Sequence, residues 1–256
     1  MKSIIAISNQ KGGIGKSTTA QAVGAGLSLK GYKTLLVDLD SQCNLTIATG
    51  ANRDHITSFD VLSKDSKATA KEAVQALDNE LLSIIPASNQ LSTIADHLPK
   101  IGRYDQLKKA LEPLKKEFDF IILDTPPALS DLTLNALMVA DRVVIPAQAD
   151  LFSLEAIKEL AGTISEIREY NAGLVIEGIL LTRYQPRSIL TQELTDVITD
   201  TAKAMNTKVF SRPIREAVAI KEAQAMHQDI FSYAPKSKVA GDYKVLIEEL
   251  SKSLLS

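Results

Sequence analysis

The chain of 256 residues is 45% hydrophobic and 23% charged, with a formal net charge of −2. These values are typical of a soluble globular protein, and they exclude a disordered, collagen-like or repeat-only chain. The length fits one large hydrophobic core, so we expect a single domain over residues 1–256.

Short apolar runs alternate with helical patterns along the chain. The first run, residues 2–8, contains three isoleucines and is typical of a strand buried on both faces of a sheet. The runs predict strands at 2–8, 34–37, 81–85, 118–123, 142–146 and 174–181, and helices at 17–30, 103–117, 130–140, 151–170 and 189–205. This alternation predicts an α/β fold with a mainly parallel, twisted sheet and helices on both faces. We expect residues 52–70, which are polar and mixed, to form a surface insertion.

Residues that would define other classes of protein are scarce. Cys43 is the only cysteine, which excludes a disulfide framework and a four-thiolate zinc site within one chain. No run approaches the ~18 apolar residues of a membrane span. We therefore expect a cytoplasmic protein.

A glycine-rich loop joins the first predicted strand to the first predicted helix. Its sequence is Asn9-Gln10-Lys11-Gly12-Gly13-Ile14-Gly15-Lys16-Ser17-Thr18. Such a loop brings backbone N–H groups against phosphate oxygens, and the helix that follows presents its positive N-terminal end to the same anion. We expect residues 12–18 to bind a nucleotide, with Lys16 at the β and γ phosphates and Ser17 at Mg²⁺. The loop departs from the GxxxxGK[ST] pattern, because Gln10 stands at the first glycine position and Lys11 adds a second lysine.

The segment KGGIGKST resembles the deviant Walker A motif of the ParA/MinD ATPases, with Lys11 at the position of their signature lysine. The resemblance implies a P-loop NTPase fold, ATP and Mg²⁺ as cofactors, and a nucleotide sandwich homodimer that forms on ATP binding. Lys11 of one copy would then act on the ATP of the other copy. A cation at the phosphates stabilises negative charge that develops during phosphoryl transfer. Lys11 would supply it in trans and Lys16 within its own chain, so both lysines are expected to be catalytic.

Two acidic positions complete the expected site. The second predicted strand continues into Asp38-Leu39-Asp40-Ser41-Gln42-Cys43-Asn44, which is similar to the family's DxDPQ-G-N stretch with Ser41 in place of proline and Cys43 in place of glycine. The resemblance places Asp40 as the carboxylate that orients the attacking water, and near the metal. Asp38 is expected to be structural or to support a residue that binds the ligand. Asp124 follows an apolar strand, as a Walker B carboxylate does, and is expected to hold Mg²⁺.

The base pocket is expected near the ends of two later strands. Thr182-Arg183 and Pro213-Ile214 stand where related ATPases surround adenine, with Thr182 in place of the asparagine of some relatives. Thr182, Arg183 and Pro213 are therefore predicted to contact the base. The preference for ATP over GTP rests on the resemblance.

The resemblance is compatible with four functions of this fold. A partitioning ATPase of the ParA type would bind nonspecific DNA as an ATP-bound dimer and release it when a ParB-type centromere-binding partner stimulates hydrolysis. An ATPase of the MinD type would need a basic amphipathic C-terminal helix, but Glu248 and Glu249 offset Lys244 and Lys252, so we expect the apolar stripe there to pack on the body and no stable membrane association. A nitrogenase-type reductase would need two cysteines per subunit, and the single Cys43 excludes it. A small-molecule ligase or kinase, the fourth alternative, would need a substrate pocket beside the γ phosphate, and no group of residues in the sequence indicates one.

The segment 203–244 carries eight Lys or Arg residues and four Asp or Glu residues, and so has a local charge of +4. It resembles the part of ParA proteins in which basic residues contact DNA phosphates. We predict DNA contacts at Arg215, Lys221, Lys236 and Lys238, with weak and salt-dependent binding. A partitioning ATPase is the favoured function, and its expected location is the cytoplasm, in association with the nucleoid.

Overall fold

The computed structural model describes residues 1–185 and 189–255. In this part of the chain a seven-stranded sheet has the order β3-β4-β2-β5-β1-β6-β7. The strands are β1 (Ser3–Ile7), β2 (Thr34–Asp38), β3 (Gln75–Ala76), β4 (Leu82–Ile85), β5 (Phe120–Asp124), β6 (Arg142–Ala147) and β7 (Val175–Leu181). All neighbouring pairs are parallel except the short β3, which is antiparallel to β4. The predicted α/β fold with a mainly parallel sheet is confirmed.

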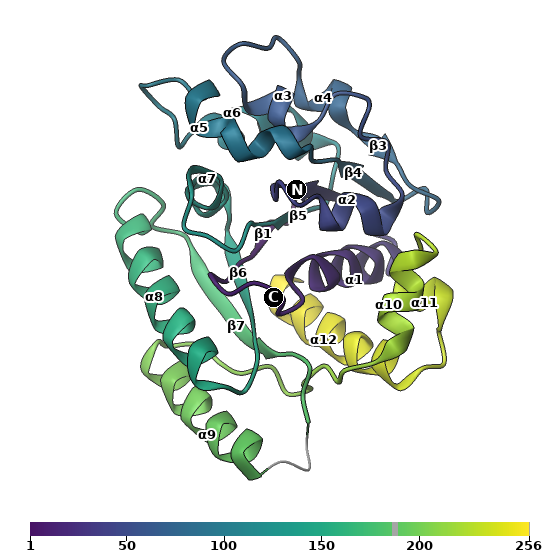
Figure 1. Ribbon diagram of the computed structural model, residues 1–256, viewed down its shortest axis with the longest axis vertical. Coiled ribbons are helices and arrows are strands. Elements are labelled where there is room, and N and C mark those ends of the chain that lie inside the picture. The colour runs from purple at the N-terminus through teal and green to yellow at the C-terminus, as the bar shows by residue number, and fades with distance from the viewer. Residues whose placement is uncertain (186–188, 256) are drawn as a thin grey trace.

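Helices cover both faces of this sheet (Figure 1). They are α1 (Lys16–Leu29), α2 (Asn44–Thr49), α3 (Ser58–Leu62), α4 (Ala70–Ala73), α5 (Ile94–His97), α6 (Gln106–Leu111), α7 (Asp131–Val139), α8 (Leu151–Ile167), α9 (Ile189–Ala204), α10 (Val218–Ala225), α11 (Ile230–Tyr233) and α12 (Lys238–Leu255), with 3₁₀ turns at Asn89–Thr93 and Glu112–Lys116. Figure 1 shows α1 and α12 side by side on one face of the sheet, and α7 and α8 on the opposite face.

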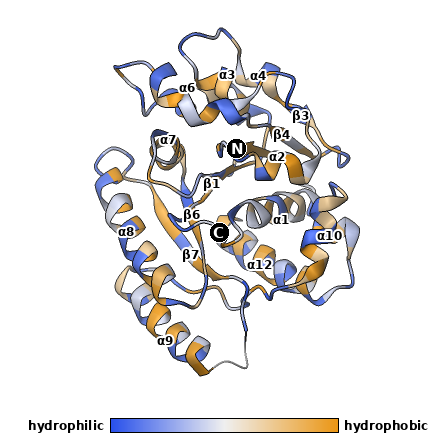
Figure 2. Ribbon diagram, viewed as in Figure 1, coloured by the Kyte–Doolittle hydropathy of each residue, from blue (hydrophilic) through white to orange (hydrophobic). Residues whose placement is uncertain are grey.

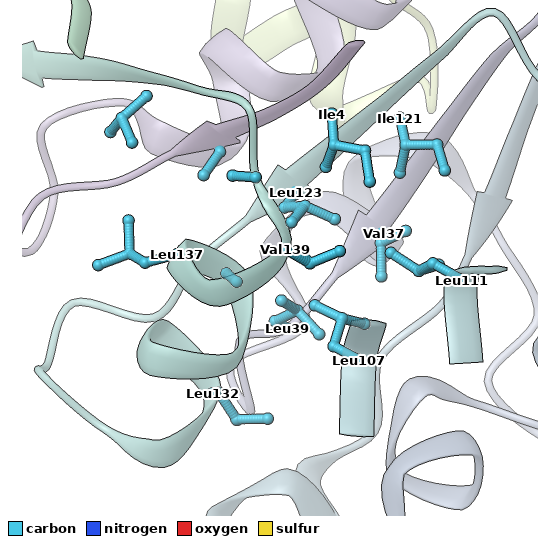
Figure 3. Packing of buried hydrophobic residues seen from close by; sticks show 14 of the residues in the cluster. Ile4, Val37, Leu39, Leu107, Leu111, Ile121, Leu123, Leu132, Leu137 and Val139 are labelled. Carbon is cyan, nitrogen blue, oxygen red and sulfur yellow. The ribbon is translucent and has the colours of Figure 1, made fainter. Parts of the chain in front are cut away.

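The alternation of side chains along each strand divides the core into two clusters. Ile4 and Ile121 point to the face covered by α6, α7 and α8, where Figure 3 shows them beside leucines from the helices. Ile5 and Ile122 point to the other face, which α1 and α12 cover. In Figure 2 the strands β6 and β7 are largely hydrophobic, whereas the helices around them have mixed surfaces. Burial on both faces explains why these strands have continuous apolar sequences.

Two sequence predictions about local structure are wrong. The helix predicted at 103–117 ends at Leu111 and continues as a 3₁₀ turn, because Pro113 has no N–H to donate and its ring clashes with the preceding turn of an α-helix. The region 52–70 is more than a surface insertion, since Phe59 and Leu62 of α3 are buried in the core. The Ser58 hydroxyl also donates a 2.7 Å hydrogen bond to the Asp38 carbonyl, which ties this region to the end of β2.

Candidate functional site

The carboxyl ends of β1, β2 and β5 meet around one cavity of about 480 Å³. Parallel strands place their carboxyl ends at one edge of a sheet, where open α/β proteins bind ligands. Described residues that line the cavity include Gly13, Lys16, Ser17, Thr18, Asp40 and Arg183. The structure thus brings together the predicted phosphate loop and the predicted acidic residue Asp40.

The loop between β1 and α1 has the backbone geometry of a phosphate cradle. Gly13 and Gly15 have φ values of +71° and +87°, a left-handed conformation that glycine adopts without steric cost. Two long-range hydrogen bonds hold the loop in place: Asn9 Nδ2 donates to the Pro146 carbonyl at 2.7 Å, and the Thr182 hydroxyl donates to the Ile14 carbonyl at 2.8 Å. Because α1 begins at Lys16, its N-terminal N–H groups face the cavity that the loop encloses.

Lys16 is the lysine that faces this cavity. Its side chain is largely buried, and Nζ donates a 2.9 Å hydrogen bond to the Lys11 carbonyl. Burial lowers the pKa of Lys16, while Asp124 and Asp40 partly oppose that shift. A cation held next to two carboxylates inside a glycine loop is suited to bind the terminal phosphates of a nucleotide.

Asp38 and Asp124 lie side by side as register partners of β2 and β5, and both are buried. Asp38 accepts three hydrogen bonds, from the Asp40 N–H and from the N–H and hydroxyl of Thr46. Neither carboxylate oxygen of Asp124 has a hydrogen-bond partner among the residues that the structure describes. Asp38 is therefore a structural residue, as predicted, whereas Asp124 has its lone pairs free for another ligand.

The electrostatics of this acidic pair favour a divalent cation. Burial raises the pKa of Asp38 to about 6, and burial followed by the Asp38 charge raises the pKa of Asp124 well above its usual value. The neighbouring Ser17 hydroxyl and then Lys16 lower the Asp124 pKa but do not cancel these effects. Buried polar groups without a partner are rare, so the two free Asp124 oxygens beside the Ser17 hydroxyl fit a hard cation such as Mg²⁺.

Asp40 lies just beyond β2 and is 6% exposed. Its Oδ1 accepts a 3.0 Å hydrogen bond from the Gln42 N–H, which fixes the carboxylate at the edge of the cavity. A fixed carboxylate at this place can accept a hydrogen bond from a water molecule near the terminal phosphate.

Lys11 is not among the described residues that line the cavity. Its Nζ forms an ion pair with Asp150 at 2.6 Å and also lies 3.3 Å from Gln148 Oε1 and 3.4 Å from the Ser153 hydroxyl. Asp150 and Gln148 follow β6, the strand beside β1, and were not identified from the sequence. The signal that could have found them is their position just after a buried parallel strand.

A second cavity, of about 140 Å³, lies next to the phosphate site. Thr182 and Arg183 line it together with Ile14, Ile214 and Tyr243, but Pro213 lines neither cavity within the described part of the chain. The Thr182 hydroxyl already donates to backbone carbonyls, and Arg183 adopts a left-handed backbone with φ of 49°. Whether these residues contact a base stays a prediction.

The four basic residues predicted to contact DNA have different surroundings. The Arg215 guanidinium forms a two-pronged ion pair with the buried carboxylate of Asp242, with Nη2 at 2.8 Å from Oδ1. Lys221 is exposed beside the second cavity, and Lys236 and Lys238 are exposed at the α11 to α12 connection. Arg215 therefore has a structural partner that the sequence did not indicate.

The fold and this site define an α/β protein of the P-loop nucleotide-binding class. A protein-family model described as "AAA domain" matches residues 2–176. The Bacillus subtilis (strain 168) sporulation initiation inhibitor protein Soj is 38% identical over 98% of this chain and 99% of its own length. The chromosome partitioning protein ParA of Myxococcus xanthus (strain DK1622) is 36% identical over 97% of this chain and 88% of its own length. The chain belongs to the ParA/Soj family of partitioning ATPases.

A solved structure with a different activity in its name is also similar. It is the cobyrinic acid a,c-diamide synthase of Mycobacterium smegmatis with bound ADP and magnesium. The TM-score is 0.85 at 31% identity, and the match covers 100% of this chain and 96% of the synthase. The shared fold therefore serves proteins with different reactions, so function has to be argued from the site.

Within the described residues, no helix has both the length and the apolar character that crossing a membrane requires.

Proposed function

We propose that this protein is an ATP-driven DNA-segregation ATPase that alternates between a single chain and a DNA-binding homodimer. The observation that carries the proposal is the arrangement of its two lysines. Lys16 faces the cavity, next to Asp40 and Asp124, whereas Lys11 is bound to Asp150 outside it. A single chain therefore presents only one of its two loop lysines to its own nucleotide site.

The described residues have the chemistry to hold and cleave ATP. The backbone N–H groups of residues 12–18 cradle the phosphates, and Lys16 contacts the β and γ phosphates. Ser17 and Asp124 hold Mg²⁺, which when bound neutralises negative charge on the phosphate oxygens. Asp40 orients the attacking water by accepting its hydrogen bond.

The second cation comes from the other subunit. Phosphoryl transfer builds negative charge on the oxygens between the β and γ phosphates, and a lysine supplied in trans stabilises that charge. Lys11 has to leave Asp150 before it reaches a partner's nucleotide, so dimerisation and hydrolysis are linked. Hydrolysis by the protein alone is consequently slow, and a ParB-type partner accelerates it.

DNA is bound by exposed basic residues of the closed dimer. Lys221, Lys236 and Lys238 are exposed and belong to the basic segment 203–244. Contacts to phosphates carry no base specificity and weaken steeply with salt, and two subunits double the number of contacts. ATP thereby controls the affinity for DNA, so the active form is expected on the nucleoid.

The membrane-bound alternative fits the structure less well. The apolar stripe of α12 is buried, with Leu246, Ile247 and Leu250 each at most 3% exposed. Ile247 packs against Gly26 of α1 so closely that a Cβ at Gly26 would overlap with Ile247 Cδ1. The expected packing of this stripe on the body is confirmed, so α12 would have to leave the core before it could bind a membrane.

Sedimentation of the Asp40→Ala variant tests the proposal, with Asp54→Ala at an exposed position as the control. We expect Asp40→Ala to bind Mg²⁺ and ATP, to sediment as a dimer, and to shift further with nonspecific duplex DNA, without turnover. Asp54→Ala should hydrolyse ATP like the wild type. Normal hydrolysis by Asp40→Ala would remove Asp40 from its role.

The similarity to a synthase supplies the second candidate function, a small-molecule ligase. Sedimentation and ATP hydrolysis measurements also distinguish a ligase from a partitioning ATPase. A solitary ATP-loaded wild-type chain with fast, DNA-independent hydrolysis would favour the ligase and contradict the partitioning proposal.

A further inference from the structure

The helix α10 is attached to the rest of the protein by limited apolar packing, through Ala219, Ile220 and Ala223, and by polar contacts. Of its eight residues, all of which the structure describes, only Ala223 is buried, and Val218 is 69% exposed. A segment with so little fully buried apolar surface has low local stability, so hydrogen bonds contribute strongly to its position.

The most important of these hydrogen bonds reaches the nucleotide site. Gln224 Nε2 donates to the Thr18 hydroxyl at 3.1 Å, and both side chains line the main cavity. Thr18 lies in the first turn of α1, directly after Lys16 and Ser17. Gln224 therefore joins α10 to the part of the phosphate loop that contacts a bound nucleotide.

The chain that follows α10 is tied to α2, which also lines the cavity. His227 Nδ1 lies 2.7 Å from the Ile47 carbonyl, and Gln21 Nε2 donates to the carbonyls of Ala48 and Gln228. Ile47 and Ala48 also line the main cavity. The carboxyl end of α10 is thus fixed against two elements of the nucleotide site, whereas Val218 at its start is exposed.

The direction of the Gln224 hydrogen bond has a chemical consequence. A threonine hydroxyl has one proton to donate and two lone pairs that accept. Because the Gln224 amide donates to Thr18, it occupies a lone pair and leaves the hydroxyl proton free to point into the cavity. The acceptor that this proton would meet there is a phosphate oxygen of the nucleotide.

We propose that Gln224 is a positioning residue, which orients the Thr18 hydroxyl toward bound nucleotide and couples the nucleotide to the position of α10. The inference rests on the proposed function, since it assumes that the main cavity binds ATP. Lys221, predicted to contact DNA, stands one helical turn before Gln224 on α10. Nucleotide binding therefore stabilises the helix that carries this basic side chain.

Replacing Gln224 by methionine tests the proposal, because methionine keeps the length of the side chain and removes the donor. Gln228→Met is the matched control, since Gln228 is exposed and its contact with Gln21 is made by its backbone carbonyl. Hydrogen exchange of the α10 amides is measured with and without Mg²⁺ and a non-hydrolysable ATP analogue. The affinity for the analogue is measured in parallel.

In the wild type and in Gln228→Met, we expect the analogue to slow exchange in residues 218–225 at least about tenfold. In Gln224→Met this slowing should disappear, and the affinity for the analogue should fall about threefold to tenfold. A purely structural role would change exchange equally with and without the analogue. A nucleotide-dependent slowing in Gln224→Met that equals the wild type would overturn the inference.

A double-mutant cycle with Thr18→Val gives a second, independent measurement. If Gln224 acts through the Thr18 hydroxyl, the variant with both changes binds the analogue no more weakly than Thr18→Val alone. Additive losses would contradict the coupling. A wild type that binds no ATP analogue would instead refute the proposed function, whereas binding without any change in α10 refutes only this inference.

Discussion

The phosphate site and the basic segment 203–244 both carry charged residues, but their charges are positioned in different ways. At the phosphate site, Asp124 ends β5, Asp40 follows β2 closely, and the loop with Lys16 joins β1 to α1, so the sheet itself brings them together. In the basic segment, Arg215 pairs with Asp242, which is 27 residues further along the chain. The surroundings of a charge near a strand end follow from the topology, whereas those of a charge in the C-terminal segment depend on tertiary packing.

The largest effect is expected at the phosphate site, from Lys16→Ala. The side chain is largely buried beside a loop carbonyl and two carboxylates, so its removal takes away the positive charge at that position. We expect nucleotide affinity to fall at least about 100-fold by calorimetry. Lys33→Ala, at an exposed lysine, should bind like the wild type. Unchanged affinity in Lys16→Ala would mean that the cavity is not the nucleotide site.

A pH profile tests the acidic pair within the same site. The folded pKa of Asp38 is about 6, above its ordinary value of 3.8, so the folded state binds a proton more tightly than the unfolded state does. The stability from this group is complete below about pH 4 and is lost as the pH rises to about 6, a change on the order of 2–3 kcal/mol. Asp38→Asn has no such proton to lose.

The wild type and Asp38→Asn are therefore compared by urea unfolding of the nucleotide-free protein from about pH 4.5 to about pH 7.5, a range that spans the titration of a carboxyl with a raised pKa. Carboxylates that do not contact Asp38 titrate alike in both proteins, so their contributions cancel in the difference. Asp124, whose pKa the Asp38 charge raises, adds a contribution of the same sign. The stability advantage of the wild type over Asp38→Asn should shrink as the pH rises. Parallel profiles would show that Asp38 does not titrate in this range.

The basic segment is tested by comparing Arg215 with the two lysines. We expect the double variant Lys236→Ala and Lys238→Ala to keep the wild-type melting temperature and to lose about tenfold in DNA affinity near about 0.1 M salt. The slope of log affinity against log salt concentration should also become shallower, by an amount that corresponds to up to about four phosphate contacts per dimer. Unchanged DNA binding would remove both lysines from the interface.

Unlike the double lysine variant, Arg215→Ala should lower the stability of the protein. It leaves the buried Asp242 carboxylate without its guanidinium, so the melting temperature should fall by a few degrees in thermal unfolding. The exposed Arg212 provides a control of the same residue type, and Arg212→Ala should melt like the wild type. A wild-type melting temperature in Arg215→Ala would mean that the ion pair adds nothing to stability.

The difference between charges near strand ends and charges in the segment 203–244 explains how far the sequence could predict the structure. The parallel sheet and the meeting of the loop, Asp40 and Asp124 follow from apolar runs, glycines and the resemblance, because backbone geometry fixes them. The ion pair of Arg215 could not be predicted, since it depends on which distant side chain packs nearby. For Lys11 the sequence shows that Asp150 follows a buried strand, but not that the two side chains meet. The contact between Gln224 and Thr18 spans 206 residues, and no local pattern marks it.

The smallest effect is expected for Asp150→Asn, which tests the residue that holds Lys11 outside the cavity and that no motif predicted. Asp150 accepts a hydrogen bond from the Ser153 N–H as the N-cap of α8, and asparagine preserves such a cap. The substitution therefore removes the charge opposite Lys11 and little else. Since a partly exposed ion pair contributes about 0.2–1 kcal/mol, the ATP-bound dimer should become about twofold to fivefold easier to form.

Sedimentation at several protein concentrations measures that change, with Asp54→Asn at an exposed position as the control for the loss of one negative charge. Equal dimerisation of Asp150→Asn and Asp54→Asn would show that the Lys11 ion pair does not compete with the partner's nucleotide. In a Lys11→Ala background, Asp150→Asn should no longer change dimerisation, because without the lysine there is no ion pair at Asp150 that opposes it.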